Sequence, residues 1–238
     1  MRNHVMARLI AFDVNETLLD LRALDPLFER AFGDAGLRAQ WFAQMLQLSF
    51  VGAVTGSYVD FPSAQRAALT MLAETTGTQL DRDDGERIVD QMRRLEPHAD
   101  VAPAFDRLAE TELPLVALTN SPLEVARDQL AHAGLADRLR AILSADQVRA
   151  LKPRPEPYHL VAESFQLRPA DVRLVAAHAW DVAGALAAGC AAAFVKRPGK
   201  VLSPLGPQPD ITGDDLIEVA ERIATADGPV NRRPSPPA

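Results

Sequence analysis

Asp13 and Thr17 are the residues whose types and spacing most clearly could do chemistry, because they follow the apolar run LIAF in LIAFDVNETLLD. A short apolar run is typical of a buried β-strand. The pattern Asp-x-x-x-Thr therefore places a carboxylate at the carboxyl end of a strand, where open α/β sheets bind ligands. An ionised carboxylate held there can act as a nucleophile. Two residues after Asp13 lies Asn15, whose amide cannot act as a general acid.

Three further polar sites follow apolar runs later in the chain. Thr119 and Asn120 offer a hydroxyl and an amide which, with backbone N–H groups, can hold an anion. Lys152 lies among prolines in LKPRPEPY, and its positive charge would lower the pKa of a nearby strand-end carboxylate. The fourth site is His178-Ala-Trp-Asp181, which adds a second carboxylate at the same predicted edge.

Each of these residues also has an ordinary structural interpretation. Asp181 could cap a helix, Lys152 could be a solvated loop charge, Tyr158 could belong to the core, and His178 could be a hydrogen-bonded polar residue. Asp13 and its threonine could form a cap and a turn. Four strand-end polar sites in this order, separated by strand–helix units, are not explained by independent caps.

Strands and helices must position these sites. The strongest β-rich segments are Arg8 to Asp13, Pro114 to Asn120, Val172 to Ala177 and Ala191 to Lys196, with a weaker one at Arg140 to Ser144. Helical patterns lie at Val101 to Leu113, Leu123 to Ala133, Glu156 to Phe165 and Val182 to Ala188. Strands that alternate with helices predict an α/β fold with a Rossmann-like parallel sheet.

A separate helical unit is predicted between the first two strong strands. Helix-like apolar spacing there covers Leu24 to Phe32, Arg38 to Phe50, Ser63 to Thr75 and Arg82 to Leu95. Because the stretch is too long for a loop in a compact domain, we predict an inserted α-helical cap at 21–97 within a catalytic core formed by 1–20 and 98–227. The proline-rich segment 228–238 is expected to be a disordered tail.

Bulk properties narrow the class of protein. The chain has 238 residues and a formal net charge of -7, which argues against nucleic acid as a partner because phosphate binding relies on clustered Lys and Arg. Its single cysteine, Cys190, allows no internal disulfide and fits the reducing cytoplasm. No signal peptide and no membrane span are evident. We therefore expect a cytoplasmic protein without a membrane partner.

The four motifs together resemble those of the haloacid dehalogenase superfamily, and within it the L-specific, type II 2-haloacid dehalogenases. The resemblance covers roughly Ala7 to Leu216. It rests on FDVNETLLD, LTNS, KPRPEPY and AAHAWDVAGA, with the cap segments WFAQMLQLSF and YVDF. The lysine motif and the Ala-Trp-Asp of the last motif are specific within the superfamily.

The resemblance implies roles for particular residues. Asp13 would attack the halogen-bearing carbon of a small 2-haloacid and form an aspartyl ester, which water then hydrolyses. Thr17 would orient Asp13, Lys152 would keep it anionic, and Tyr158 and Asp181 would support Lys152 and the hydrolytic water. The substrate carboxylate and halogen would meet the following residues: Val14, Asn15, Phe42, Leu46, Phe61, Thr119, Asn120 and Trp180. No metal or cofactor is expected, and a homodimer through the cap is common in the family.

Two other functions compete with this one. A magnesium-dependent phosphatase of the same superfamily needs an acid where Asn15 stands, to protonate the leaving alkoxide. It also needs a carboxylate after the last motif's strand, where Ala176 and Ala177 stand. Halide leaves without a proton, so dehalogenation does not miss the acid. A non-catalytic carboxylate-binding protein is the third class, against which the costly cluster of buried charges argues.

Departures from the dehalogenase pattern are informative. The family usually has an aromatic residue at Asn15, and after Trp41 an arginine that is thought to meet the halide, where this chain has Phe42. A serine position of the last motif is Ala176, and an asparagine position is His178. Because histidine titrates near neutral pH, His178 could activate the hydrolytic water or supply charge to the halide.

Overall fold

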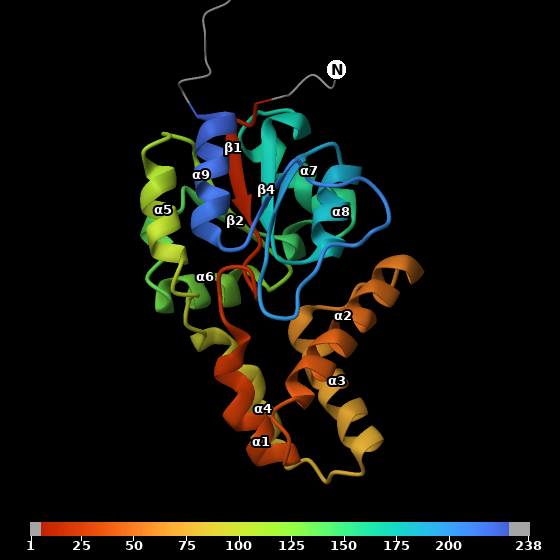
Figure 1. Ribbon diagram of the computed structural model, residues 1–238. Coiled ribbons are helices and arrows are strands. Elements are labelled where there is room, and N and C mark those ends of the chain that lie inside the picture. The colour runs from red at the N-terminus through yellow and green to blue at the C-terminus, as the bar shows by residue number, and fades with distance from the viewer. Residues whose placement is uncertain (1–5, 229–238) are drawn as a thin grey trace, which may run out of the picture.

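A computed structural model describes residues 6–228 as a parallel sheet with helices on both faces and a helical extension at one end (Figure 1). The strands are β1 (Leu9–Phe12), β2 (Leu115–Thr119), β3 (Ala141–Ser144), β4 (Val172–Ala176), β5 (Ala191–Val195) and β6 (Ile211–Gly213). They pair in the order β3-β2-β1-β4-β5-β6, and every pair is parallel. The predicted α/β fold is confirmed. β6 was not predicted, because three residues are too short for a pattern.

Alternation along β1 directs its side chains to the two faces of the sheet. Leu9 and Ala11 pack into one apolar cluster, and Ile10 and Phe12 into the other. The first cluster contains residues of α7 (Pro155–Ser164) and α8 (Ala179–Ala187). The second contains residues of α5 (Val101–Ala109), α6 (Leu123–His132) and α9 (Leu216–Asp227). Burial on both faces explains why the strands are continuous apolar runs.

Predicted helices of the core appear with small shifts. α8 begins three residues before the predicted Val182, because Ala179, Trp180 and Asp181 form its first turn. The pattern analysis missed α9, which begins after an N-cap at Asp215. Short 3-10 helices are η3 (Ala136–Arg138), η4 (Ala145–Val148) and η5 (Pro169–Asp171).

The extension consists of helices alone among the described residues. It runs through η1 (Leu21–Leu24), α1 (Asp25–Phe32), α2 (Leu37–Thr55), α3 (Phe61–Thr76), α4 (Arg82–Gln91) and η2 (Met92–Arg94). α2 continues five residues beyond the predicted end and stops at Gly56, whose φ of 74° is a left-handed cap conformation. Figure 1 shows α2 and α3 side by side, with α1 and α4 forming a second pair.

The two crossings between core and extension run beside each other. The Asp20 N–H donates to Glu96 O at 2.8 Å, and the His98 N–H donates to Leu18 O at 2.9 Å. These bonds lie near the predicted limits of the cap, and the division at 20/21 and 97/98 stays a prediction. The predicted tail lies outside the described residues from position 229 onward. Within 6–228, no helix is both long and apolar enough to span a bilayer.

Candidate active site

The sheet order brings the four predicted polar sites to one edge. The chain leaves β1 in one direction through β2 and β3, and in the other through β4, so the order reverses between β1 and β4. Asp13 follows β1 and Thr119 ends β2, while Lys152 lies beyond β3 and His178 follows β4. Open parallel sheets bind ligands at such a reversal point. The extension covers this same edge (Figure 1).

Asp13 is held through both carboxylate oxygens. Lys152 Nζ donates to Asp13 Oδ1 at 2.9 Å, and Thr17 Oγ1 donates to Asp13 Oδ2 at 2.6 Å. The Thr17 hydroxyl in turn accepts the backbone N–H of Ala177 at 2.9 Å, which couples β1 to the end of β4. A carboxylate fixed at both oxygens keeps one orientation before any substrate arrives.

Lys152 is fully buried, and its ammonium has three partners. Besides Asp13, it donates to Asp181 Oδ2 at 2.6 Å and to the carbonyl of Leu118 at 2.9 Å. Tyr158 donates its hydroxyl to the other oxygen of Asp181 at 2.6 Å. The three donors of the ammonium are therefore all used, and one cation bridges the two carboxylates of the site.

Shared charge sets the protonation of this cluster. Burial acts to raise the pKa of Asp13, but Lys152, His178 and the Thr17 hydrogen bond lower it below the usual 3.8. Burial acts to lower the pKa of Lys152, but the two carboxylates raise it above 10.5. The pKa of Asp181 is raised above 3.8, by burial first and then by the charge of Asp13. Asp13 is thus the carboxylate that stays ionised most readily.

Asn120 positions the lysine loop with its side chain. Its Oδ1 accepts the Lys152 N–H at 2.8 Å and its Nδ2 donates to Lys152 O at 3.2 Å. The peptide bond between Lys152 and Pro153 is cis. The hydroxyl of Thr119 accepts the Ser121 N–H at 3.1 Å and so shapes the turn before α6. The predicted contact of the Asn120 backbone N–H with the substrate carboxylate stays a prediction, and the side chain of Asn120 contacts the lysine loop.

The Asn15 amide is also occupied. It donates to Ser121 Oγ at 3.2 Å, and it accepts from Gln129 Nε2 at 3.0 Å. Gln129 was not predicted, although a glutamine within the apolar spacing of α6 was a usable signal. Its Nε2 also donates to the Met92 carbonyl at 2.6 Å, which links the site to the base of the extension.

Aromatic rings form one wall of the site. The His178 ring is stacked between Phe42 of α2 and Trp180 of α8, with centroids 5.9 and 5.2 Å away. Phe50 meets Trp180 edge-on at 5.3 Å. The indole Nε1 of Trp180 is buried and makes no hydrogen bond within the described chain.

The remaining predicted pocket residues are buried beside this wall. Leu46 and Phe61 of the extension belong to the same apolar cluster as Phe42 and Val14. An apolar environment around a carboxylate nucleophile removes water that would otherwise shield it. The strand ends of the core thus supply the charge of the site, and the extension, together with Trp180 of α8, supplies its apolar surface.

His178 faces the carboxylate side of the site with Nε2. This atom lies 3.3 Å from the Asn15 carbonyl, 3.8 Å from Asp13 Oδ2 and 3.6 Å from Glu16 Oε2. Glu16 was not among the predicted site residues, because its approach depends on the backbone turn after β1. An ionised, desolvated aspartate beside a histidine is suited to attack carbon and then to be released by water.

Comparison with known proteins agrees with this chemistry. The family described as haloacid dehalogenase-like hydrolase matches residues 7–189. An (S)-2-haloacid dehalogenase of Xanthobacter autotrophicus is 32% identical over 194 residues, which cover 81% of this chain and 76% of that protein. One from Pseudomonas sp. (strain YL) is 29% identical over 92% of this chain and 95% of its own length.

Solved structures give the same result. The L-2-haloacid dehalogenase of X. autotrophicus with chloropropionic acid covalently bound superposes with a TM-score of 0.84 at 27% identity, covering 92% of this chain and 98% of that one. A capped parallel sheet with a buried strand-end aspartate and the family match together define the class as a hydrolase of the haloacid dehalogenase-like type. The chain belongs to the haloacid dehalogenase-like hydrolases and, within them, to the (S)-2-haloacid dehalogenase family.

Proposed function

We propose that this enzyme hydrolyses short 2-haloalkanoic acids to 2-hydroxy acids through an ester on Asp13. The observation that carries the proposal is the pairing of Asp13 with Lys152 at 2.9 Å inside an apolar pocket. It keeps the nucleophile ionised without water around it. The neighbouring Asn15 offers no acidic proton, and the displacement of a halide needs none.

The reaction proceeds in two steps. An oxygen of Asp13 attacks the carbon that bears the halogen from the side opposite the halogen, so this carbon inverts and the halide leaves with the bonding electron pair. Water then attacks the carboxyl carbon of Asp13 and releases the 2-hydroxy acid. Lys152 and Thr17 hold the carboxylate for the first step. For the second step, Asp181 and Tyr158 keep the lysine in place, and His178 lies close enough to orient or activate the water.

Substrate binding draws on both parts of the molecule. The substrate carboxylate is assigned to Thr119 and to the backbone N–H groups of Val14, Asn15 and Asn120. The halogen and the short carbon chain are assigned to the apolar wall, made by the residues Phe42, Leu46, Phe61 and Trp180. Closure of this wall would desolvate the carboxylate of Asp13 before it attacks.

A phosphatase mechanism fits the same residues less well. The Lys152 ammonium lies 2.9 Å from Asp13 and 2.6 Å from Asp181, so both carboxylates already pair with a cation. Ala177 supplies no oxygen side chain at the end of β4, and hard cations require several oxygen ligands. Non-catalytic binding of a carboxylate would leave the coupled charges of Lys152 unused.

Halide release tests the proposal. The enzyme is incubated with 2-chloropropionate, 2-bromoacetate and fluoroacetate, with and without a chelator. Halide release that the chelator does not change is expected, together with a mass increase on Asp13 after rapid quenching. Asp13→Asn should lose at least about 10⁴-fold in turnover, because the nucleophile is gone. Magnesium-dependent hydrolysis of a phosphate ester would replace the proposal with a phosphatase, and ligand binding without product would replace it with a binding protein.

We also propose a cytoplasmic homodimer that forms through the extension. Val51 and Val54 of α2 are 53% and 88% exposed, and they line an apolar groove with Phe50. Exposed apolar surface of this kind is typical of an interaction site. Sedimentation should give a dimer for the wild type and a monomer for Val54→Asp, while a wild-type monomer would reject the proposal.

A further inference from the structure

Glu16 adopts a backbone conformation that an L-residue rarely takes. Its φ is 61°, in the left-handed region that glycine adopts without strain. The turn is fixed by the Glu16 N–H, which donates to Leu19 O at 2.9 Å. Non-glycine residues in this region are concentrated at functional sites, where the surrounding structure holds them. The contacts of the Glu16 carboxylate show which groups this backbone conformation brings together.

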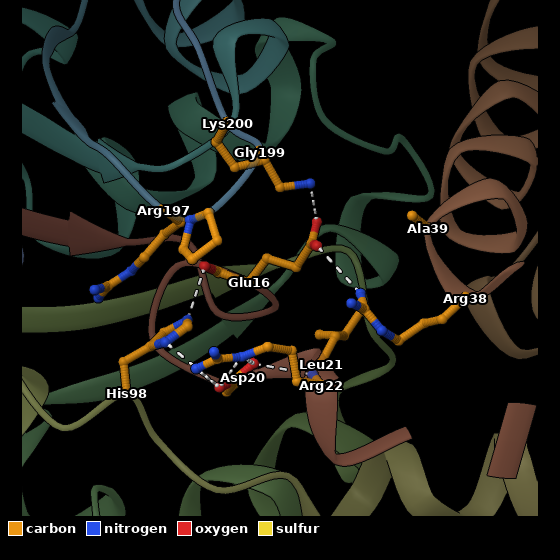
Figure 2. Close-up of a pocket in the computed structure, with 11 residues that line it drawn as sticks. Glu16, Asp20, Leu21, Arg22, Arg38, Ala39, His98, Arg197, Gly199 and Lys200 are labelled. Atoms are coloured by element: carbon orange, nitrogen blue, oxygen red, sulfur yellow. Dashed lines mark hydrogen bonds and ion pairs between the residues drawn. The ribbon is translucent and has the colours of Figure 1, made fainter. Parts of the chain in front are cut away.

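The Glu16 carboxylate lies among three cationic or ionisable side chains. Lys200 Nζ is 2.5 Å from Oε2, and Arg38 Nη1 of the extension is 4.0 Å from Oε1. His178 Nε2 is 3.6 Å from Oε2. Figure 2 shows the glutamate reaching between Lys200 of the core and Arg38 of the extension.

Glu16 also lines a cavity between core and extension. The cavity has a volume of about 160 Å³, and Arg38, His98, Arg197 and Lys200 are among the residues that surround it (Figure 2). Asp13 and His178 do not line it. The glutamate carboxylate therefore stands between the buried nucleophile and the cavity.

Hydrolysis of the ester requires a route for one proton. Water forms a bond to the carboxyl carbon of Asp13, and the bond from this carbon to the product oxygen breaks. The product oxygen takes up one proton of the water, Asp13 returns to its ionised form, and the second proton must leave the buried site. Lys152 and Asp181 cannot pass it on to solvent, because both are fully buried and paired with each other.

We propose that Glu16 is the relay that takes this proton from His178 and delivers it to the cavity. His178 Nε2 faces three oxygen atoms, Asn15 O at 3.3 Å, Glu16 Oε2 at 3.6 Å and Asp13 Oδ2 at 3.8 Å, so it is placed to donate a proton toward Glu16. Lys200 and Arg38 form ion pairs with the Glu16 carboxylate on the side of the cavity, which both of them line. The inference rests on the proposed ester mechanism, and Glu16 acts through His178 without touching the substrate.

The test separates the two chemical steps in single-turnover experiments. Glu16→Gln keeps the size and the backbone strain of Glu16 but cannot accept the proton. We expect its alkylation rate to stay within about threefold of wild type, and its ester hydrolysis to slow about 10²-fold, in the range of lost acid–base assistance. The ester on Asp13 should then accumulate and be detected by mass. Added imidazole or formate should restore hydrolysis by carrying the proton.

Two further variants exclude a structural explanation. Glu16→Gly removes the carboxylate and the strain together, so it should accumulate the ester and show the same rescue while unfolding at no lower urea concentration than Glu16→Gln. Asp20→Asn is the matched control, since Asp20 lines the same cavity but pairs with Arg22 and His98. It should hydrolyse the ester at the wild-type rate.

The outcomes distinguish this inference from the proposed function. Ester decay at the wild-type rate in both Glu16 variants, or slow decay that no buffer restores, would overturn the relay and leave the dehalogenase reaction intact. A wild-type enzyme that forms no ester would overturn the proposed function and the relay with it.

Discussion

Two buried cations in this molecule each hold two carboxylates, and one of them lies at the proposed active site. Lys152 pairs with Asp13 and Asp181 at the carboxyl edge of the sheet. Arg173 pairs with Asp227 at 2.6 Å and with Asp210 at 2.5 Å, near the start of β4. Both cations have 0% exposed side chains. Burial of a charge cluster therefore does not identify a functional site by itself.

The difference lies in what the carboxylates can still do. Asp227 accepts two guanidinium bonds and the Ala7 N–H at 2.9 Å, so it joins α9 to the beginning of the chain. The planar guanidinium suits such a fixed, multidentate arrangement. Asp13 instead faces an aromatic wall and a histidine, where a substrate can approach. Location at the reversal of strand order, more than burial, separates the reactive cluster from the structural one.

Removal of Lys152 should have the largest effect. Lys152→Met leaves two buried carboxylates without their cation, so Asp13 becomes protonated more easily and loses nucleophilicity. We expect single-turnover alkylation to fall about 10³-fold and the free energy of unfolding to fall by about 3–5 kcal/mol. Rapid-quench halide release and urea denaturation measure the two effects. Near-normal alkylation would mean that the lysine is as structural as Arg173.

Arg173→Met should affect stability alone. Without the guanidinium, the buried Asp227 carboxylate lacks its cation. We therefore expect a similar loss of about 3–5 kcal/mol in the free energy of unfolding. Turnover per folded molecule should stay within about twofold of wild type, because the cluster lies away from the catalytic edge. Activity measured at a temperature where the variant is fully folded checks this point. A selective loss of kcat would contradict the separation of the two clusters.

The pH dependence of the first step should reflect the Lys152 cluster. The pKa of Asp13 lies below 3.8, so its contribution to stability is present above that pH and is lost as the pH falls through the lower folded value. The pKa of Lys152 lies above 10.5, so its contribution is present below that pH and is lost as the pH rises through the higher folded value. Because Asp13 stays ionised below its usual pKa, alkylation should persist at pH 4. Lys152→Met should shift the acid limb of the pH–rate profile of alkylation to higher pH. An unchanged acid limb in the variant would show that another group protects Asp13.

Tyr158→Phe should have the smallest effect. The phenol donates to Asp181 at 2.6 Å, and its pKa is raised well above 10.0 by burial and by the Asp181 charge, so it remains a donor. Loss of this bond should lower the free energy of unfolding by about 1.5–3 kcal/mol. Because Lys152 keeps its own bonds, alkylation should change less than about tenfold. A loss as large as that of Lys152→Met would make the phenol a direct participant in catalysis.

The sequence predicted that the four polar sites share one sheet edge, because order along the chain determines which residues follow parallel strands. Asp13, Lys152 and Asp181 meet for this topological reason, without any need for atomic detail. The contacts of Glu16 and of the Asn120 side chain were not predicted, because they depend on a left-handed turn and on the path of a loop. The cost of burying a group of charges does not by itself predict a catalytic site, because the Arg173 cluster is also a costly group of buried charges.

The extension was predicted as helical because apolar spacing is a local property. Its contacts with the core were not predictable in the same way. Lys200 lies 5.6 Å over the Phe42 ring and also pairs with Glu16, and this arrangement requires the loop after β5 to meet α2. Such contacts arise from packing between segments far apart in the sequence. β6 was not predicted because a strand of three residues gives only a weak sequence pattern. α9 was not predicted because it lies beyond the last of the four chemical motifs.

The adjacent crossings at 18–20 and 96–98 have an evolutionary consequence. Since Leu18 bonds to His98 and Asp20 to Glu96, the chain leaves and re-enters the core at nearly one point. A segment inserted between such neighbouring ends does not alter the order of the strands, and its length changes the entropy of loop closure only slowly. The helical segment 21–97 can therefore be exchanged as one unit without a change in the strand order. Substrate range can diverge between homologues through that exchange while Asp13 and Lys152 remain in place.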